Sequence, residues 1–311
     1  MLGITAIGSY IPEGRHSNYD RMAGFGVDAA FIENRIGVRR VAVKGEDEQT
    51  SDLCVAAFRD LQTRVAFDPA SIDAVVVVTQ NPDRNIPHTS AIVHGKLDLS
   101  EHCACFDVSL GCSGYVYGLS ILLGFMERGG LGRGLLLTAD PYSMIVDPAD
   151  KNTAMLFGDA ATVTLLDENY AFRPIDFTFG TAGSRHEDLY CQGQTLFMNG
   201  RSIYSFVAEY VPRDIQTLLN RSGLSVGEVD RFLFHQGSRH MVETLIKRLK
   251  LDPARVPYKI EDHGNTVSSS IPLLLKDELT DESVRKVVIS GFGVGLSWAS
   301  AVLTRVGGAR A

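Results

Sequence analysis

Short apolar runs and longer segments with a helical pattern alternate along the chain. Residues 74–78 and 104–108 are short β-rich runs, and the further apolar runs at 134–138 and 161–166 are too continuous for strands that face water on one side. Residues 88–96 and 112–128, which lie between these runs, have helical patterns. Buried strands that alternate with helices predict an α/β fold in which helices cover both faces of a sheet.

The second half of the chain repeats the outline of the first. A helix, a turn, a branched aliphatic residue followed by Asp73, and an apolar strand succeed one another, and the same series returns at a constant offset around Asp230. The strand at 134–138 likewise resembles the strand at 286–290. A fixed-offset repeat of this length favours two similar α/β halves over a solenoid, which would need shorter and more numerous units.

The two halves are predicted to comprise residues 1–170 and 171–311, with the boundary within 167–174. Residues 181–199 are richer in glycine and polar side chains and have no clear periodicity. We interpret this stretch as an excursion that borders a site or an interface.

Composition and charge exclude several classes of protein. The 311 residues carry 30 Lys and Arg against 37 Asp and Glu, a formal net charge of −7, without a long basic block. A nucleic-acid partner, whose phosphates need clustered cations, is therefore not expected. No apolar run approaches the ~18 residues of a membrane span, and the N-terminus lacks the basic region of a signal peptide. We expect no membrane contact and take the cytoplasm as the default location.

The cysteines suggest one reactive thiol among inert ones. They are odd in number and form no pair of CxxC motifs, so the sequence predicts neither a disulfide framework nor a metal site. Cys103 and Cys105 are spaced for one face of a strand and are expected in the core. The five cysteines are Cys54, Cys103, Cys105, Cys112 and Cys191.

Cys112 is the candidate nucleophile. It follows the strand at 104–108, has Gly111 and Gly114 beside it, and is predicted to start the helix at 112–128. A thiol at a helix start lies near unpaired N–H groups and the positive end of the helix dipole, which favour the thiolate. The alternative is that Cys112 is a small buried residue, as most free cysteines are.

Three further segments carry residues with chemical potential. His235 ends a hydrophobic strand, and Asn265 lies in a polar loop that enters a helix. With Cys112 they form a possible Cys/His/Asn constellation, although a histidine at a strand end is more often structural. The glycines of residues 290–298 let backbone approach a substrate and expose N–H donors. A phosphate-loop interpretation of this segment is weak, because a strand rather than a long helix follows it.

Taken together, these residues resemble the β-ketoacyl-acyl-carrier-protein synthase III family of the thiolase fold. The resemblance spans nearly the whole chain, and it implies a five-layered α/β/α/β/α fold of two similar halves, normally a homodimer. Its motifs are Gly111-Cys112-Ser113-Gly114, Phe157-Gly158-Asp159-Ala160-Ala161, His235-Gln236, His263-Gly264-Asn265-Thr266 and Gly291-Phe292-Gly293, in this order.

The resemblance also implies a role for each motif residue. Cys112 takes an acyl group from a thioester, while the backbone N–H groups of Cys112 and Val294 stabilise the oxyanion. His235 and Asn265 then donate hydrogen bonds to a malonyl thioester, and these bonds stabilise the enolate left by decarboxylation. The expected substrates are acyl-CoA or an acylated acyl carrier protein, followed by malonyl-acyl-carrier-protein. No metal or redox cofactor is expected.

Some positions that the resemblance assigns to substrate binding depart from the family pattern. Phe31 and Lys151 stand where family members carry a tryptophan and an arginine around the adenine of CoA, so weaker stacking is expected. Arg35 matches the basic residue near the pantetheine entrance, and Phe292 belongs to the substrate-binding surface. Ile86 lies where a residue reaches into the acyl pocket of the partner subunit. Because isoleucine is smaller than an aromatic ring, primers longer than acetyl are expected to fit.

A basic stripe is the expected docking surface for the acidic carrier. It comprises Arg239, Lys247, Arg248 and Lys250, while His240 stands where a docking arginine is common. A solvated helix face is the alternative interpretation.

Other functions remain open at this point. One is a specialised acyltransferase or condensing enzyme of secondary metabolism or surface-sugar acylation. Another is a non-catalytic subunit of a heterodimer, against which the intact Cys/His/Asn set argues. A thiolase is less favoured, because the resemblance lacks the second cysteine that the thiolase family carries near its C-terminus. A generic cysteine hydrolase is least favoured.

Overall fold

The computed structural model describes residues 1–306 of the chain. Residues 307–311, the end of the predicted second half, lie outside the described part. The strands are β1 (Gly3–Tyr10), β2 (Gly14–Ser17), β3 (Arg40–Val43), β4 (Ala74–Val78), β5 (Ala104–Val108), β6 (Gly134–Ala139), β7 (Ala161–Asp167), β8 (Phe172–Thr181), β9 (Leu189–Gln192), β10 (Thr195–Met198), β11 (Arg231–Phe234), β12 (Lys286–Gly293) and β13 (Ser297–Arg305). The α-helices are α1 (Met22–Phe25), α2 (Thr50–Arg64), α3 (Thr89–Leu97), α4 (Gly114–Gly129), α5 (Lys151–Ala154), α6 (Gly200–Arg221), α7 (Arg239–Leu249) and α8 (Ser270–Glu278).

Within residues 1–306, one large sheet is folded into two parts. Its nine strands follow the order β11-β12-β13-β8-β1-β7-β6-β4-β5. β8 and β1 are joined by a single residue pair, Phe172 with Ile4, so the strands on either side of this junction form separate faces. The shorter pairs β2–β3 and β9–β10 lie outside this sheet.

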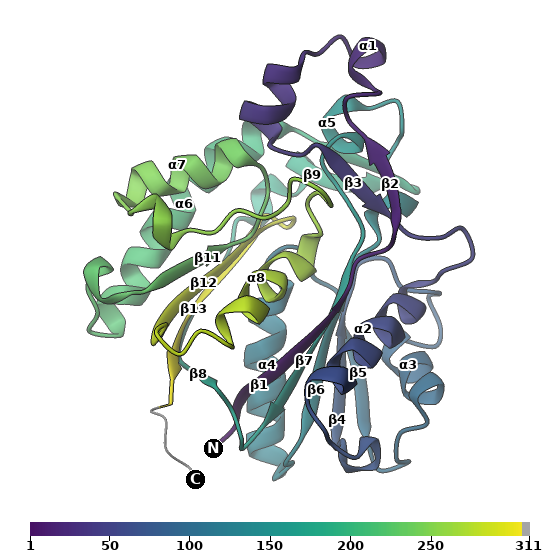
Figure 1. The fold of residues 1–311 in the computed structure, drawn as a ribbon, viewed down its shortest axis with the longest axis vertical. Coiled ribbons are helices and arrows are strands. Elements are labelled where there is room, and N and C mark those ends of the chain that lie inside the picture. The colour runs from purple at the N-terminus through teal and green to yellow at the C-terminus, as the bar shows by residue number, and fades with distance from the viewer. Residues whose placement is uncertain (307–311) are drawn as a thin grey trace.

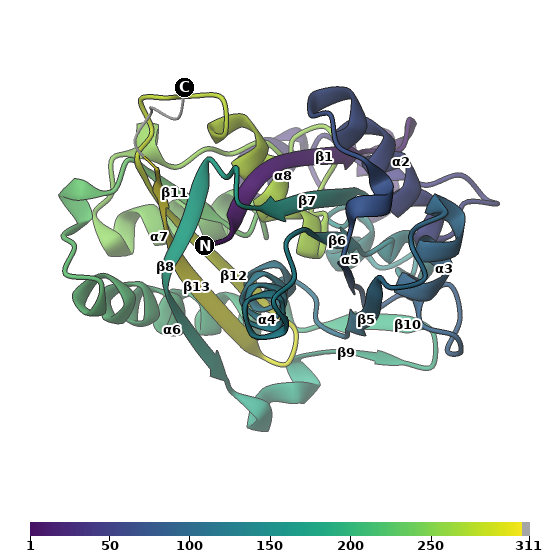
Figure 2. The ribbon, with the colours of Figure 1, turned by 90° about the horizontal axis from the view of Figure 1, so that it is seen from below.

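Helices cover the two parts of the sheet in layers. α2 and α3 pack on the outer face of the first part, and α6, with α7 against it, covers the outer face of the second (Figure 1). α4 contacts β4 and β6 on one side and β12 and β13 on the other, so it lies between the two parts (Figure 2). α8 shares this central layer, because it contacts β1 and β7 as well as β11 and β12. The result is the α/β/α/β/α arrangement that the resemblance implied.

The apolar runs of the first half form the strands that were expected of them. β4 is buried at every position and pairs in parallel with β5 and β6. The helix expected at 88–96 is α3. The helix expected from Cys112 begins two residues later, at Gly114, because the Gly114 N–H donates to the Gly111 carbonyl at 2.7 Å and closes a turn there.

The Asp that recurs in the sequence repeat has the same structural task in both halves. Asp73 Oδ2 accepts two backbone N–H groups from the turn that leads into β6, at 2.7 and 2.9 Å. Asp230 Oδ2 accepts two N–H groups at the start of β12, both at 2.8 Å. Since β4 and β6 are parallel neighbours, as are β11 and β12, each carboxylate ties together the starts of two adjacent strands. The repeat therefore marks an equivalent joint in the two halves.

The junction between the halves and the irregular stretch at 181–199 are both ordered in the structure. β7 ends at Asp167 and β8 begins at Phe172, so the predicted boundary falls in the turn between them. The stretch at 181–199 contains the 3-10 segment Gly183–Asp188 and the hairpin of β9 and β10. Its position is relevant to the site, because this hairpin contributes part of the cavity wall.

Candidate active site

Cys112 lies in the turn between β5 and α4, where the end of β12 packs directly against it. A Cβ atom at Gly293 would lie 2.8 Å from Cys112 Sγ, and one at Gly291 would lie 2.5 Å from the Cys112 carbonyl oxygen. These distances are too short for any larger residue, so the glycines are required for the close approach. The glycine-rich segment thus positions β12 against the thiol.

The surroundings of Cys112 correct one expectation. The thiol is 5% exposed, and burial together with the negative charge of Asp140 raises its pKa to about 12. The backbone N–H groups of Cys112 and Val294 act in the opposite direction, which places both donors near the sulfur. The resting group is therefore a protonated thiol rather than the expected thiolate, because burial outweighs the N–H groups near the sulfur.

The backbone at Val294 lies outside the left-handed region, which a branched side chain rarely adopts. Within residues 1–306, the non-glycine residues with positive φ are Asp98, Lys250 and Val267. Val294 is not among them, so its backbone N–H is offered from a conformation that a valine adopts without strain.

His235 directly follows the last residue of β11 and is held from two sides. Its Nδ1 atom lies 2.7 Å from Ser270 Oγ, and its ring packs edge-on against Phe292 with centroids 5.5 Å apart. Burial lowers the pKa of His235 to about 3, so the imidazole is neutral. With Nδ1 turned to Ser270, Nε2 is the nitrogen left for the cavity that contains Cys112.

The amide of Asn265 has a fixed orientation. Its Oδ1 atom accepts the backbone N–H of Val267 at 2.9 Å, a bond that only the oxygen end of the amide can make. Its Nδ2 group is therefore the end that remains for the cavity. The Asn265 backbone is bound in turn to the segment at 156–158, donating to Leu156 at 2.8 Å and accepting from Gly158 at 3.0 Å. This explains why the second and fourth motifs occur together.

The three candidate catalytic residues line one narrow cavity. Cys112 comes from the first half, and His235 and Asn265 come from the second, so the structure brings the predicted constellation together. The cavity has a free volume of about 30 Å³, which holds roughly two water molecules. Its walls are otherwise mostly apolar: Leu156, Phe157, Leu189, Met198, Ile203, Val207, Gly237, Met241, Phe292 and Gly293.

A wider cavity of about 920 Å³ adjoins the narrow one, with which it shares Leu156, Met198 and Met241. Its wall includes the predicted substrate-binding residues Phe31, Arg35 and Lys151, and Phe292 lies in the narrow cavity instead. Ile86 lines neither cavity, and its side chain is 81% exposed. The remaining wall residues of the wider cavity include Asn152, Phe197, Asn199, Gly200, Arg201, Tyr204, Ser205, Ser238 and His240.

The predicted docking stripe is smaller in the structure than in the sequence. Lys247 and Arg248 are exposed on α7. Arg239 is engaged within the chain, because it pairs with Glu261 at 3.1 Å and its guanidinium lies 4.4 Å from the centroid of the Tyr258 ring. Arg239 therefore supports the fold rather than offering a free cation to a carrier.

Sequence reasoning missed Ser270, which contacts His235. It belongs to a run of three serines after Asn265, and nothing in the sequence separates one from the others. In the structure Ser268 bonds to Asp140 and Ser269 to the Thr138 side chain, whereas Ser270 alone of the three meets the histidine.

The described residues contain neither a cluster of metal-ligating side chains nor a helix that could span a membrane. Across residues 1–306, His, Cys, Asp and Glu side chains do not gather in threes that could hold an ion. In the same part of the chain, every helix is too short or too polar to cross a membrane.

Comparison with known proteins identifies similar chains over the whole length. Residues 106–183 match the family described as 3-oxoacyl-[acyl-carrier-protein (ACP)] synthase III, and residues 219–305 match its C-terminal domain. A β-ketoacyl-[acyl-carrier-protein] synthase III of Deinococcus deserti is 34% identical over 99% of this chain and 92% of that protein.

Solved structures agree in fold. The β-ketoacyl-[acyl-carrier-protein] synthase III of Thermus thermophilus superimposes with a TM-score of 0.89 at 33% identity, over 99% of this chain and 100% of the other. The priming β-ketosynthase of the R1128 polyketide pathway superimposes with a TM-score of 0.89 at 27% identity, over 98% and 96% of the two chains. The predicted thiolase-type fold is confirmed by these similarities.

Proposed function

The chain belongs to the 3-oxoacyl-[acyl-carrier-protein] synthase III family of condensing acyltransferases, and from this premise we propose that Cys112 carries the acyl group through a decarboxylative condensation. The acyl group comes from a thioester, and the second substrate is a malonyl thioester on an acyl carrier protein. The observation that carries this proposal is the single narrow cavity lined by Cys112, His235 and Asn265.

Acyl transfer begins when Cys112 Sγ attacks the thioester carbonyl carbon. Because the resting thiol is protonated, a base must remove its proton, and the neutral His235 imidazole offers Nε2 for this task. The carbonyl oxygen becomes an oxyanion that accepts from the backbone N–H groups of Cys112 and Val294. The leaving thiolate of CoA or of the carrier takes a proton, and the acyl-cysteine remains.

Condensation uses the other side of the cavity. The malonyl thioester oxygen accepts hydrogen bonds from Asn265 Nδ2 and from His235 Nε2, provided that Nε2 now carries the proton. These donors stabilise the enolate as the carboxylate leaves as carbon dioxide. The enolate carbon then attacks the acyl-cysteine carbonyl, the C–S bond breaks, and the sulfur is reprotonated. The chemistry uses side chains and backbone donors, and it calls for no metal or redox cofactor.

The wide cavity suits the long arm of CoA or of a carrier prosthetic group. Arg35 and Lys151 supply positive charge for phosphate, and the half-buried Phe31 supplies a face for stacking. Lys247 and Arg248 on α7, together with Lys250 directly after it, are the remaining exposed cations of the docking stripe. An acidic carrier would meet this local patch on a chain whose formal net charge is −7.

We propose that the working unit is a homodimer formed through β5. This strand is one of the two edges of the large sheet, its five residues are all half-buried, and Phe106 packs edge-on against Phe125, which is 41% exposed. Unpaired backbone groups beside apolar side chains favour the addition of a second copy of the strand. Light scattering should give twice the chain mass, and a monomer would contradict this assembly.

A specialised pathway remains the second candidate. The similarity to a priming ketosynthase of polyketide biosynthesis favours it, because that protein shares the fold over nearly the whole chain. Retention of Asn265, with its Nδ2 group left for the cavity, favours condensation over simple acyl transfer in either pathway.

Offering the protein a series of acyl thioesters, with a malonyl carrier, tests the function and the primer length together. We expect an acyl adduct at Cys112, a 3-oxoacyl product, and a kcat/KM that is higher for primers longer than acetyl, because Ile86 is smaller than an aromatic ring. Mass spectrometry measures both adduct and product. If acetyl has the highest kcat/KM and chains beyond about four carbons do not react, the primer prediction is wrong; if no primer acylates the protein, the function is wrong.

A further inference from the structure

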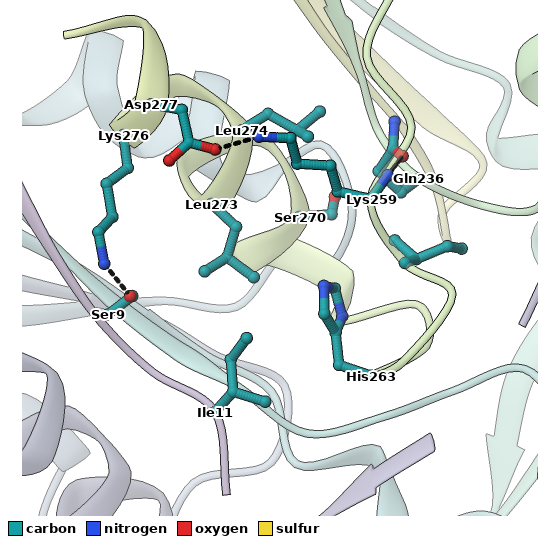
Figure 3. A pocket seen from close by; sticks show the side chains of 11 residues that line it. Ser9, Ile11, Gln236, Lys259, His263, Ser270, Leu273, Leu274, Lys276 and Asp277 are labelled. Atoms are coloured by element: carbon teal, nitrogen blue, oxygen red, sulfur yellow. Dashed lines mark hydrogen bonds and ion pairs between the residues drawn. The ribbon is translucent and has the colours of Figure 1, made fainter. Parts of the chain in front are cut away.

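A third cavity lies behind the candidate histidine, on the side away from Cys112. It has a volume of about 230 Å³, enough for several water molecules, and opens between β1, the loop before Asn265 and α8 (Figure 3). Gln236, His263 and Ser270 line it where it approaches His235. We call it the rear cavity.

The His235–Ser270 pair spans the wall between the two cavities. His235 lines the narrow cavity with Cys112, and Ser270 lines the rear cavity. Nδ1 and Oγ of the pair lie 2.7 Å apart. A Cβ at Gly237, another wall residue of the narrow cavity, would lie 3.8 Å from Nε2, which places this nitrogen on the Cys112 side.

Two hydrogen-bond arrangements are available to this pair. The Ser270 hydroxyl lies 3.0 Å from the Val267 carbonyl oxygen as well as 2.7 Å from Nδ1. When it donates to Val267, Nδ1 must carry the proton and Nε2 is a free acceptor. When it donates to Nδ1, Nε2 carries the proton and is a donor. The Val267 oxygen also accepts the backbone N–H of Ser270. This oxygen therefore keeps one hydrogen bond when the Ser270 hydroxyl turns away from it.

We propose that Ser270 is a positioning residue that moves protons between His235 and the rear cavity, so that the ring changes tautomer between the two half-reactions without becoming charged. The inference rests on the proposed function. A charged imidazolium at a site 3% exposed is costly, and a relay avoids it.

During acyl transfer, the protons move away from Cys112. The Sγ–H proton passes to Nε2 as sulfur bonds to the carbonyl carbon, the Nδ1 proton passes to Ser270 Oγ, and the former hydroxyl proton goes to water in the rear cavity. The leaving thiolate takes one proton from solvent, so no net proton is consumed. The ring ends with its proton on Nε2, the form that the enolate requires.

During condensation the relay runs in reverse. The malonyl carboxylate leaves as carbon dioxide, the enolate carbon bonds to the acyl carbon, and the electron pair of the broken C–S bond stays on Cys112. The sulfur takes the Nε2 proton, Nδ1 takes the proton of Ser270, and Ser270 takes one from the rear cavity. One proton is consumed for each carbon dioxide released, which balances the reaction.

The charged groups that line the rear cavity are engaged with partners. Lys259 Nζ pairs with Asp277 at 2.5 Å, and Lys276 Nζ bonds to Ser9 at 2.6 Å (Figure 3). Lys276 Nζ also pairs with Asp60 at 3.2 Å. Burial lowers the pKa of His263. We therefore assign the transport of the proton to water in this cavity rather than to any one of these groups.

The test compares the rates of acylation and of condensation in Ser270→Ala with those in Ser269→Ala. Both variants remove a buried hydroxyl from one turn, but Ser269 bonds to the Thr138 side chain and not to His235. We expect Ser270→Ala to lower kcat for both half-reactions about 10- to 100-fold, as loss of a histidine's hydrogen-bond partner does elsewhere, with KM nearly unchanged. In mixtures of H2O and D2O, the rate of the wild-type protein should depend on several moving protons, and the rate of Ser270→Ala should depend on one.

A cavity-filling variant tests the route independently of Ser270. Leu273→Phe places a ring in the rear cavity without touching His235. We expect this variant to slow single-turnover condensation several-fold and to leave the affinity for the acyl thioester unchanged. Native kcat and proton inventory in Ser270→Ala would overturn the positioning role, and a native rate in Leu273→Phe would overturn the route. Failure of the wild-type protein to form an acyl adduct would instead refute the proposed function.

Discussion

Replacing Cys112 with alanine is expected to lower the condensation rate by about 10,000-fold or more, since the variant has no sulfur to hold the acyl group. No acyl adduct should form. Slow release of carbon dioxide from the malonyl thioester should persist, because His235 and Asn265 remain in the cavity and still stabilise an enolate. Intact-protein mass spectrometry and carbon dioxide release measure the two activities separately.

Cys105→Ala is the matched control for this experiment. A hydrogen bond from Cys103 lowers the pKa of Cys105, whereas burial raises that of Cys112, so Cys105 is the stronger competitor on acidity alone. We expect Cys105→Ala to keep the adduct and the condensation rate, because Cys105 lines neither cavity of the site. An adduct that survives in Cys112→Ala and disappears in Cys105→Ala would move the nucleophile to β5.

Asn265→Asp is expected to separate the two half-reactions. The aspartate keeps the oxygen that accepts from Val267 N–H, so the loop is preserved, but it replaces the Nδ2 donor with a negative charge. Condensation should fall about 100- to 1,000-fold, the usual effect of removing one donor to a developing oxyanion. Acyl transfer to Cys112 should stay close to the native rate, because its oxyanion uses backbone N–H groups instead.

Single-turnover acylation followed by addition of the malonyl carrier measures both rates in one experiment. Asn152→Asp makes the same exchange at the wall of the wide cavity, where the added charge weakens thioester binding at most, and we expect the condensation rate at saturating malonyl carrier to stay unchanged. Equal losses of acylation and condensation in Asn265→Asp would contradict a role confined to the enolate.

The sequence predicted the strands and the motif residues well for a physical reason. The continuous apolar run at 74–78 favours a strand covered on both faces and forms the fully buried β4, whereas the run at 104–108 forms the half-buried edge strand β5. Cys112 stood out because Gly111 and Gly114 flank it, and a Cβ atom at these positions would lie 2.5 Å from Gln80 Oε1 and 2.5 Å from Val78 Cγ1. Local patterns of this kind are visible without knowing what lies across the cavity.

Properties that depend on distant segments could not be predicted in the same way. A helix start favours a thiolate, but the pKa of Cys112 also depends on burial beneath β12 and on Asp140, more than 20 residues away along the chain. The pairing of Arg239 with Glu261 and the contact of Ser270 with His235 likewise arise only when separate loops meet. Their side-chain types give no local signal of either contact.

The central position of α4 has a consequence for synthesis of the chain on the ribosome. One face of this helix packs on β4 and β6, which are synthesised shortly before and after it. The other face packs on β12 and β13, which are synthesised near the end of the chain. Until then an apolar helix face, with the Cys112 turn at its start, stays uncovered in the nascent polypeptide. Cotranslational chaperones therefore have a defined target here, and the nucleophile matures only when the glycine-rich end of β12 closes over it.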